Sequence, residues 1–221
     1  MMPLSLPRMQ GIKNALGVSL NDLVLTAVAG AVGRYHVRCG APLEELECVV
    51  PMNLRQAHER ELPGNRIGLF VVPLPVGEPD PLQRLKKICS QTTAAKTNGG
   101  GSASQFLLQA LPFIPGVAFR AASQALRGKI GLICTNVPGP RTLRYLDGAK
   151  VDAIYPFLPA MFGIPLTVAL LSYGDTYAVG IDTDDAAITR PELLSRYFGD
   201  AVDEIERRAL PQHNGHARPS Q

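Results

Sequence analysis

The chain has 221 residues, of which 46% are hydrophobic and 19% charged, a balance typical of a globular protein with one large domain or two small ones. This composition excludes a disordered or fibrous chain. The formal net charge of +3 is weak and the basic residues are dispersed, which argues against a nucleic-acid-binding protein.

The cysteines and the N-terminus indicate the cellular compartment of the protein. The cysteines are far apart, with no CxxC pair and no neighbouring histidine at metal-ligand spacing: Cys39, Cys48, Cys89 and Cys134. We expect free, buried thiols in a reducing compartment, and no metal. Residues 1–10 carry prolines instead of an apolar signal core, and no run reaches membrane-spanning length. These features predict a soluble, cytoplasmic protein.

The first strong pattern is a helix. Apolar residues recur every three or four positions from Leu20 to Tyr35, which predicts a long, buried helix ending near Gly40. Ser19 is its expected N-cap, with Asp22 three residues later as in a capping box.

Strands and a second helix are predicted next. Residues 47–52 and 67–75 are short apolar runs, and Pro73 and Pro75 confine the end of the second run to a sheet edge or a bulge. Asp80 followed by Pro81 predicts the N-cap and first residue of a helix that reaches about residue 96. The glycine-rich residues 98–102 indicate a flexible break, and two short helices are expected at residues 104–111 and 117–127.

An apolar strand is predicted at residues 129–134, and the next six residues are expected to end it in a rigid, open kink. Each proline fixes its own φ and restricts the residue before it. The Pro-Gly pair resembles a type II turn, although a proline in the fourth position cannot close the hydrogen bond. The six residues are Thr135, Asn136, Val137, Pro138, Gly139 and Pro140.

The C-terminal third is predicted to be β-rich. One hairpin is expected around Asp147-Gly148, from residues 144–146 to 151–155, and a second joins residues 166–173 to 177–183. Residues 191–210 form a final helix that begins with Pro191, and residues 211–221 are a disordered tail. The order of elements predicts one α+β domain over residues 1–210, with a mixed, mostly antiparallel sheet covered by helices on one face.

Five ordered motifs resemble the C-terminal domain of the wax ester synthase/acyl-CoA:diacylglycerol acyltransferase family. They are Asn21-Asp22 with the helix after them, residues 50–55, residues 64–68 with Leu74-Pro75, residues 135–140, and residues 171–174. The resemblance covers about residues 4–205. It implies a chloramphenicol-acetyltransferase-like lobe and acyl transfer, with acyl-CoA as co-substrate and a long-chain alcohol or diacylglycerol as acceptor. Peripheral contact with a membrane or lipid droplet is also implied.

Ester formation needs a general base, which the family assigns to the second histidine of an HHxxxDG motif in its N-terminal lobe. This chain lacks that motif. Its only Asp-Gly is Asp147-Gly148, where Thr142 and Leu143 stand in place of the histidines, and no histidine has an aspartate four residues later. We therefore expect the chain alone to be inactive, with the catalytic lobe supplied by another chain or a longer one. Its uncovered inter-lobe face is expected to bind that lobe or to self-associate.

The resemblance implies candidate tunnel or motif residues, each with a structural alternative. Asn21 and Asp22 either cap the helix or shape the tunnel, whereas Asn65 and Gly68 are positional or contact substrate. Residues 135–140 would line the acyl-CoA tunnel at the lobe junction. The apolar loop 156–165 either packs in the core or forms an acyl-chain wall through Phe157, Met161 and Phe162.

Two other functions stay open. The missing base favours a non-catalytic, lipid-binding or partner subunit derived from the same family. A peptide-synthetase condensation lobe shares the superfamily fold but matches residues 135–140 and 172–174 less well.

Overall fold

The computed structural model describes residues 1–53, 67–97, 130–160 and 163–210. The strands are β1 (Met2–Ser5), β2 (Leu46–Asn53), β3 (Ile67–Leu74), β4 (Leu132–Val137), β5 (Tyr145–Leu146), β6 (Ala149–Lys150), β7 (Leu166–Tyr173) and β8 (Thr176–Thr183). The helices are α1 (Leu6–Leu16), α2 (Leu20–Arg38), α3 (Pro81–Thr97) and α6 (Pro191–Ala209).

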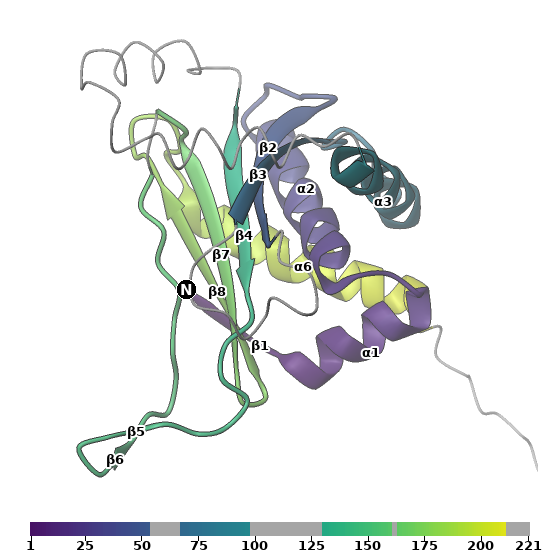
Figure 1. Ribbon diagram of the computed structural model, residues 1–221. Helices are drawn as coiled ribbons and strands as arrows, with labels where there is room; N and C mark the ends of the chain where they lie inside the picture. Colours follow the sequence, from purple (N-terminus) through teal and green to yellow (C-terminus); the bar gives the residue numbers. More distant parts are fainter. Residues whose placement is uncertain (54–66, 98–129, 161–162, 211–221) are drawn as a thin grey trace, which may run out of the picture.

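Within these ranges, six strands form one mixed sheet in the order β1-β8-β7-β4-β2-β3, while β5 and β6 form a separate hairpin. β1–β8, β7–β8 and β2–β3 pair antiparallel, and β4 pairs parallel with both β2 and β7. The four helices lie together against one face of the sheet (Figure 1). The predicted α+β fold, with a mostly antiparallel sheet covered on one face, is confirmed.

α2 is the central helix of the helical layer. The Ser19 hydroxyl oxygen accepts the Asp22 backbone N–H at 3.1 Å, so the predicted N-cap is confirmed. Every residue from Asp22 to Gly33 is buried, mainly against α6 and α3. The core beneath α2 consists of the alternate strand residues that face it, such as Val50, Cys134 and Leu170.

Two further predictions from proline and cap patterns are confirmed. β3, which contains Pro73, is an edge strand of the sheet. Asp80 Oδ1 accepts the backbone N–H groups of Leu82 and Gln83, each at 2.9 Å, and thereby caps α3.

The N-terminus contains two elements that are not among the predicted ones, β1 and α1. β1 adds to the sheet edge beside β8, where the missing N–H of Pro3 is tolerated. The Ser5 side chain then caps α1 by accepting the Arg8 N–H at 3.3 Å, and α1 ends at Gly17, whose φ is 66°. The Ser5-to-Pro7 start and the Gly17 stop are local signals that could have predicted α1.

Two predicted strands differ in the structure. β4 begins at Leu132 and continues to Val137, because Asn136 and Val137 still pair with Leu170 and Leu171 of β7. The prolines therefore end the strand only after Val137. Residues 151–155 are not a strand, since the β5–β6 ladder stops at the Tyr145–Lys150 pair.

The four cysteines are free, but they are not all buried. Cys48 and Cys134 are buried, Cys89 is half-buried and Cys39 is exposed. Cys39 is exposed because it caps the C-terminus of α2 at the surface.

Several predictions lie outside the described residues: the break at 98–102, the helices at 104–111 and 117–127, and the tail at 211–221. Within the described ranges, no single helix is long and apolar enough to cross a membrane, whereas α1 and α2 together, bent by 99°, meet that test by length and composition.

Candidate functional site

Most of the described motif segments meet at one end of the sheet. β2, β4 and β7 run parallel, so their carboxyl ends lie along the same edge. Gly68 of β3 pairs with Met52 near the end of β2, and Asn136 of β4 pairs with Leu170. The register therefore places Gly68 and residues 135–140 at this carboxyl edge.

The N-terminus of α2 points toward the same edge. Near the other end of α2, a Cβ atom on Gly33 would lie 2.0 Å from the carbonyl oxygen of Val76, just after β3. Val28 and Val32 share a small apolar gap with Leu166, at the beginning of β7. α2 therefore runs antiparallel to β7 (Figure 1). Asn21 and Asp22, in the first turn of α2, thus lie toward the end at which β4 and β7 finish.

Asp22 is both a cap and a bridge between helices. Its Oδ2 accepts the Ser19 hydroxyl at 2.6 Å, and its Oδ1 accepts the Thr92 hydroxyl of α3 at 2.8 Å. Only 7% of Asp22 is exposed, so its carboxylate is satisfied inside the protein. Asp22 thus fixes α3 to the start of α2, whereas its half-buried neighbour Asn21 is more accessible.

Residues 138–140 are held against the end of β7. Gly139 N–H donates to the Ser172 hydroxyl at 3.0 Å, and Gly174 N–H donates to the Pro140 carbonyl at 3.3 Å. A Cβ atom on Gly139 would lie 2.0 Å from the Ser172 carbonyl oxygen. The kink and residues 172–174 therefore form one structural unit.

The Pro-Gly pair does not form a type II turn, in keeping with the predicted open kink. Such a turn needs a positive φ at its third residue, and Gly139 does not have one. Glycine is required at this position by the close approach of β7. Gly139 carries the only backbone N–H among residues 138–140, because the other two residues are prolines. This N–H needs a hydrogen-bond acceptor. No local pattern identifies it as Ser172, which lies 33 positions away.

The residues just before the kink are the accessible part of the unit. Thr135 and Asn136 are half-buried, and Val137 is 46% exposed. Among the residues that the structure describes, none forms a hydrogen bond with the Asn136 side chain. The rigid backbone therefore presents the Asn136 amide on the helix-covered face of the sheet and the Val137 side chain on the opposite face, both at the carboxyl edge.

The described parts of the 156–165 loop, residues 156–160 and 163–165, lie over the second face of the sheet. The Pro156 carbonyl lies above Gly180, the Thr167 hydroxyl donates to the Leu158 carbonyl, and Ala160 N–H donates to Asp182 at 3.2 Å. Ile164 is buried in a small cluster with Val49 and Ile133, and Leu158 packs against that cluster.

Core packing therefore describes part of the loop but not Phe157, which is 66% exposed. Met161 and Phe162 lie outside the described residues, as does Asn65.

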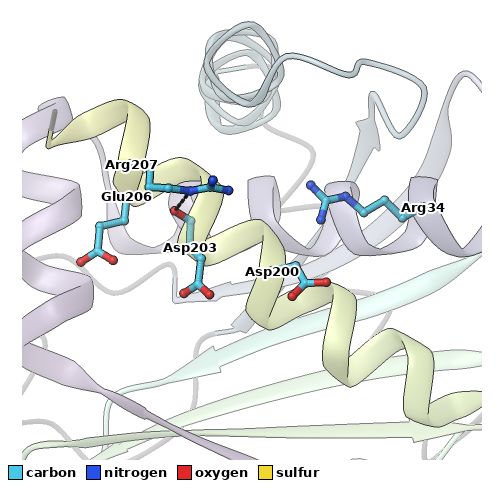
Figure 2. A pocket seen from close by; sticks show the side chains of 5 residues that line it. All are labelled: Arg34, Asp200, Asp203, Glu206 and Arg207. Carbon is cyan, nitrogen blue, oxygen red and sulfur yellow. Dashed lines mark hydrogen bonds between the residues drawn. The ribbon is translucent and has the colours of Figure 1, made fainter. Parts of the chain in front are cut away.

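A surface pocket of about 520 Å³ lies away from the motif edge. Figure 2 shows its charged lining from α2 and α6: Arg34, Asp200, Asp203, Glu206 and Arg207. Arg8 of α1 pairs with Asp203 and Glu206, and Arg34 pairs with Glu204, so these charges join the helices to one another. Such a lining does not suit an acyl chain, which needs apolar walls.

The described residues contain no evident catalytic base or nucleophile. His36 lies at the end of α2 with Nδ1 3.1 Å from the Ala41 carbonyl oxygen, and His58 is outside the described ranges. Burial raises the pKa of the Cys134 thiol to about 12 and also raises that of Cys48, so both thiols stay protonated. No group of three or more potential metal ligands occurs in the described part of the chain.

Comparisons with known proteins agree with this architecture. The model of the WS/DGAT C-terminal domain matches residues 63–206. The chain is 30% identical over 209 residues to a probable diacylglycerol O-acyltransferase of Mycobacterium tuberculosis, covering 90% of this chain and 45% of that protein. It is also 30% identical to O-acyltransferase WSD of Acinetobacter baylyi, covering 91% of this chain and 44% of the relative.

Solved structures show the same fold. A wax ester synthase/diacylglycerol acyltransferase from Marinobacter aquaeolei VT8 superposes with a TM-score of 0.73 at 23% identity, covering 94% of this chain and 48% of that one. An epimerization domain of tyrocidine synthetase superposes with a TM-score of 0.62 at 13% identity, covering 96% of this chain and 48% of that one. This chain thus spans less than half the length of these relatives. It belongs to the WS/DGAT family, whose C-terminal domain it matches.

Proposed function

We propose that this chain is the C-terminal lobe of an acyl-CoA-dependent O-acyltransferase that esterifies long-chain alcohols or diacylglycerol. The observation that carries the proposal is the unit formed by residues 135–140 and 172–174. It holds a rigid backbone at the carboxyl edge of the sheet, where the Asn136 amide has no hydrogen-bond partner among the described residues. A preorganised polar group beside apolar side chains suits a lipid thioester, which has one polar centre on a long apolar chain.

The proposed reaction divides its chemistry between two lobes. The acceptor hydroxyl oxygen attacks the thioester carbonyl carbon while a histidine of HHxxxDG takes the hydroxyl proton. The C–S bond then breaks, and the CoA sulfur leaves with that proton as a thiol. This chain supplies no such histidine, so its proposed role is to form one wall of the acyl-CoA tunnel, with Asn21, Gly68, Asn136 and Phe157 as its candidate lining residues.

The test compares this chain alone with a joined polypeptide in which it replaces the C-terminal half of the Acinetobacter relative. The substrates are palmitoyl-CoA with hexadecanol or dioleoylglycerol, and ester product is measured directly. We expect ester only from the joined polypeptide, and none once its HHxxxDG histidines are replaced by alanine. Turnover by the chain alone would overturn the division of roles. A folded but inactive joined protein would overturn the acyltransferase proposal.

The absence of HHxxxDG also favours a second candidate, a lipid-binding or partner subunit without catalysis. Under that function, the joined protein would bind palmitoyl-CoA but form no ester with either acceptor. The same assay with a binding measurement therefore separates the two functions.

A further inference from the structure

Ser172, near the end of β7, faces the same side of the sheet as Asn136. Side chains alternate along a strand, and buried Leu170 belongs to the core beneath the helices, so Ser172, two residues later, shares that helix-covered face. Asn136 shares it by the same count from buried Cys134 of β4. Because the register pairs Asn136 with Leu170, Ser172 and Asn136 are diagonal neighbours on adjacent strands at the carboxyl edge.

The Ser172 hydroxyl is held by one hydrogen bond and keeps its own donor free. Its oxygen accepts the Gly139 N–H at 3.0 Å. A serine hydroxyl can both accept and donate, and none of the described residues accepts the Ser172 hydroxyl hydrogen. A hydroxyl that accepts one hydrogen bond becomes a stronger donor, because the two bonds polarise each other. Ser172 is half-buried, so a ligand at the carboxyl edge can reach it.

The backbone around Gly139 fixes where the Ser172 hydroxyl lies. Pro138 and Pro140, on either side of Gly139, each have a restricted φ. Gly174 N–H donates to the Pro140 carbonyl at 3.3 Å, which ties the kink to the end of β7 a second time. The hydroxyl is therefore preorganised, and preorganised donors are the ones that stabilise charge developing in a transition state.

The chemistry of the two free donors indicates what they bind. The Asn136 amide N–H and the Ser172 O–H are both uncharged. Phosphates and carboxylates are bound most strongly by charged donors such as arginine, whereas amide and hydroxyl donors suit the oxygen of a carbonyl group. In acyl transfer, that oxygen is the atom on which negative charge develops when the acceptor alcohol attacks.

We propose that Ser172 is a further catalytic residue, whose hydroxyl donates to the thioester carbonyl oxygen of acyl-CoA together with the Asn136 amide. When the acceptor oxygen attacks the carbonyl carbon, the electron pair of the C=O π bond moves to the carbonyl oxygen, and both donors stabilise its charge. When the C–S bond breaks, the π bond forms again, so Ser172 neither gains nor loses a proton. The inference rests on the proposed function, which supplies the histidine that takes the hydroxyl proton.

Steady-state kinetics of the joined polypeptide test the catalytic role. Ser172→Ala should lower kcat about 100-fold and leave KM for palmitoyl-CoA nearly unchanged, because this hydrogen bond strengthens as the charge develops. Ser172→Thr keeps a hydroxyl and should restore most of the loss. Ser195→Ala is the matched control, since Ser195 is a half-buried serine of α6, and it should keep parental kinetics.

Isotope-edited infrared spectroscopy tests the contact without turnover. The ligand is palmitoyl-CoA with an isotope-labelled carbonyl, bound to the joined polypeptide whose HHxxxDG histidines are replaced by alanine. Hydrogen bonds lower the C=O stretching frequency, so that frequency should rise in Ser172→Ala and rise again when Asn136→Ala is added. An equal frequency in the single and double variants would show that Ser172 only positions Asn136, which contradicts a direct contact.

The two measurements also separate this proposal from the proposed function. Ester formation with parental kcat in Ser172→Ala would overturn the catalytic role of Ser172 and leave the acyltransferase proposal intact. A carbonyl frequency that depends on Ser172, without ester formation when the histidines are present, would overturn only the acyltransferase proposal. Failure of palmitoyl-CoA to bind the joined polypeptide would overturn both.

Discussion

Gly139 is the residue at which the kink has least space. Its missing side chain lets the backbone of residues 138–140 approach the Ser172 carbonyl, where a Cβ atom would lie at 2.0 Å. Because the obstacle is backbone, the strand or the kink must move if that atom is added.

Gly139→Ala is therefore expected to lower the free energy of unfolding by about 2 kcal/mol, measured by urea denaturation. Gly11→Ala is the control. Gly11 lies within α1 with nothing within 4 Å of its Cβ position, so alanine should leave stability unchanged or raise it slightly. Equal stability of both variants with the parent would show that the kink does not depend on close approach to β7.

Cys134 predicts how stability responds to alkaline pH. Burial raises its folded pKa from the ordinary value of 9.0 to about 12, so the protonated thiol is favoured by the fold. Stability from this group is complete below the unfolded pKa and is lost as pH rises from about 9 towards 12, because the unfolded thiol then ionises first. The loss is roughly 1.4 kcal/mol per pH unit in that interval.

Denaturation from pH 7.5 to 11 checks this effect. Cys134→Ala should make the alkaline decline shallower, although Cys48 and Tyr177 contribute too because burial also raises the pKa of each. Exposed Cys39→Ala should leave the slope unchanged. An unchanged slope in Cys134→Ala would contradict the buried, protonated thiol.

At the scale of elements, Asp22 joins two helices of the helical layer, α2 and α3. A simple cap would tolerate Asp22→Ser, but serine is too short to keep the 2.8 Å bond between Asp22 Oδ1 and the Thr92 hydroxyl. Thr92→Val keeps the shape of the side chain and leaves that buried oxygen unsatisfied, at a cost of about 1–3 kcal/mol.

A double-mutant cycle over Asp22→Ser and Thr92→Val should therefore give a coupling of about 1 kcal/mol by chemical denaturation. Thr93→Val is the control, since Thr93 is exposed and its hydroxyl bonds to the Cys89 carbonyl of its own helix. Strictly additive effects of the two changes would show that Asp22 acts only as the cap of its own helix.

Local chemistry explains which elements could be predicted. Ser19, Asp80, Asp147-Gly148 and Pro191 mark the starts of helices or a turn within a few residues, and the structure follows these signals. The end of β4 could not be placed in this way, because its last residues are strand only through pairing with β7. The hydrogen-bond partners of Gly139 and Asp22 could not be predicted from the sequence either, because each hydrogen bond joins segments far apart in the chain.

At the scale of the whole molecule, the two faces of the sheet have different roles. The helix-covered face contains the larger core, which joins all four helices to the sheet. The other face carries a much smaller core cluster of Val49, Ile133 and Ile164. The larger core therefore lies between the sheet and the helices.

The most direct measurement is the steady-state kinetics of ester formation by the joined polypeptide carrying Asn136→Ala. We predict that kcat/KM for palmitoyl-CoA falls at least about tenfold, which corresponds to the loss of one hydrogen bond worth roughly 1.4 kcal/mol, and that thermal stability is unchanged. Asn14→Ala, the same change at an exposed position of α1, should keep parental kinetics. Parental kcat/KM in Asn136→Ala would contradict the claim that residues 135–140 face the acyl-CoA.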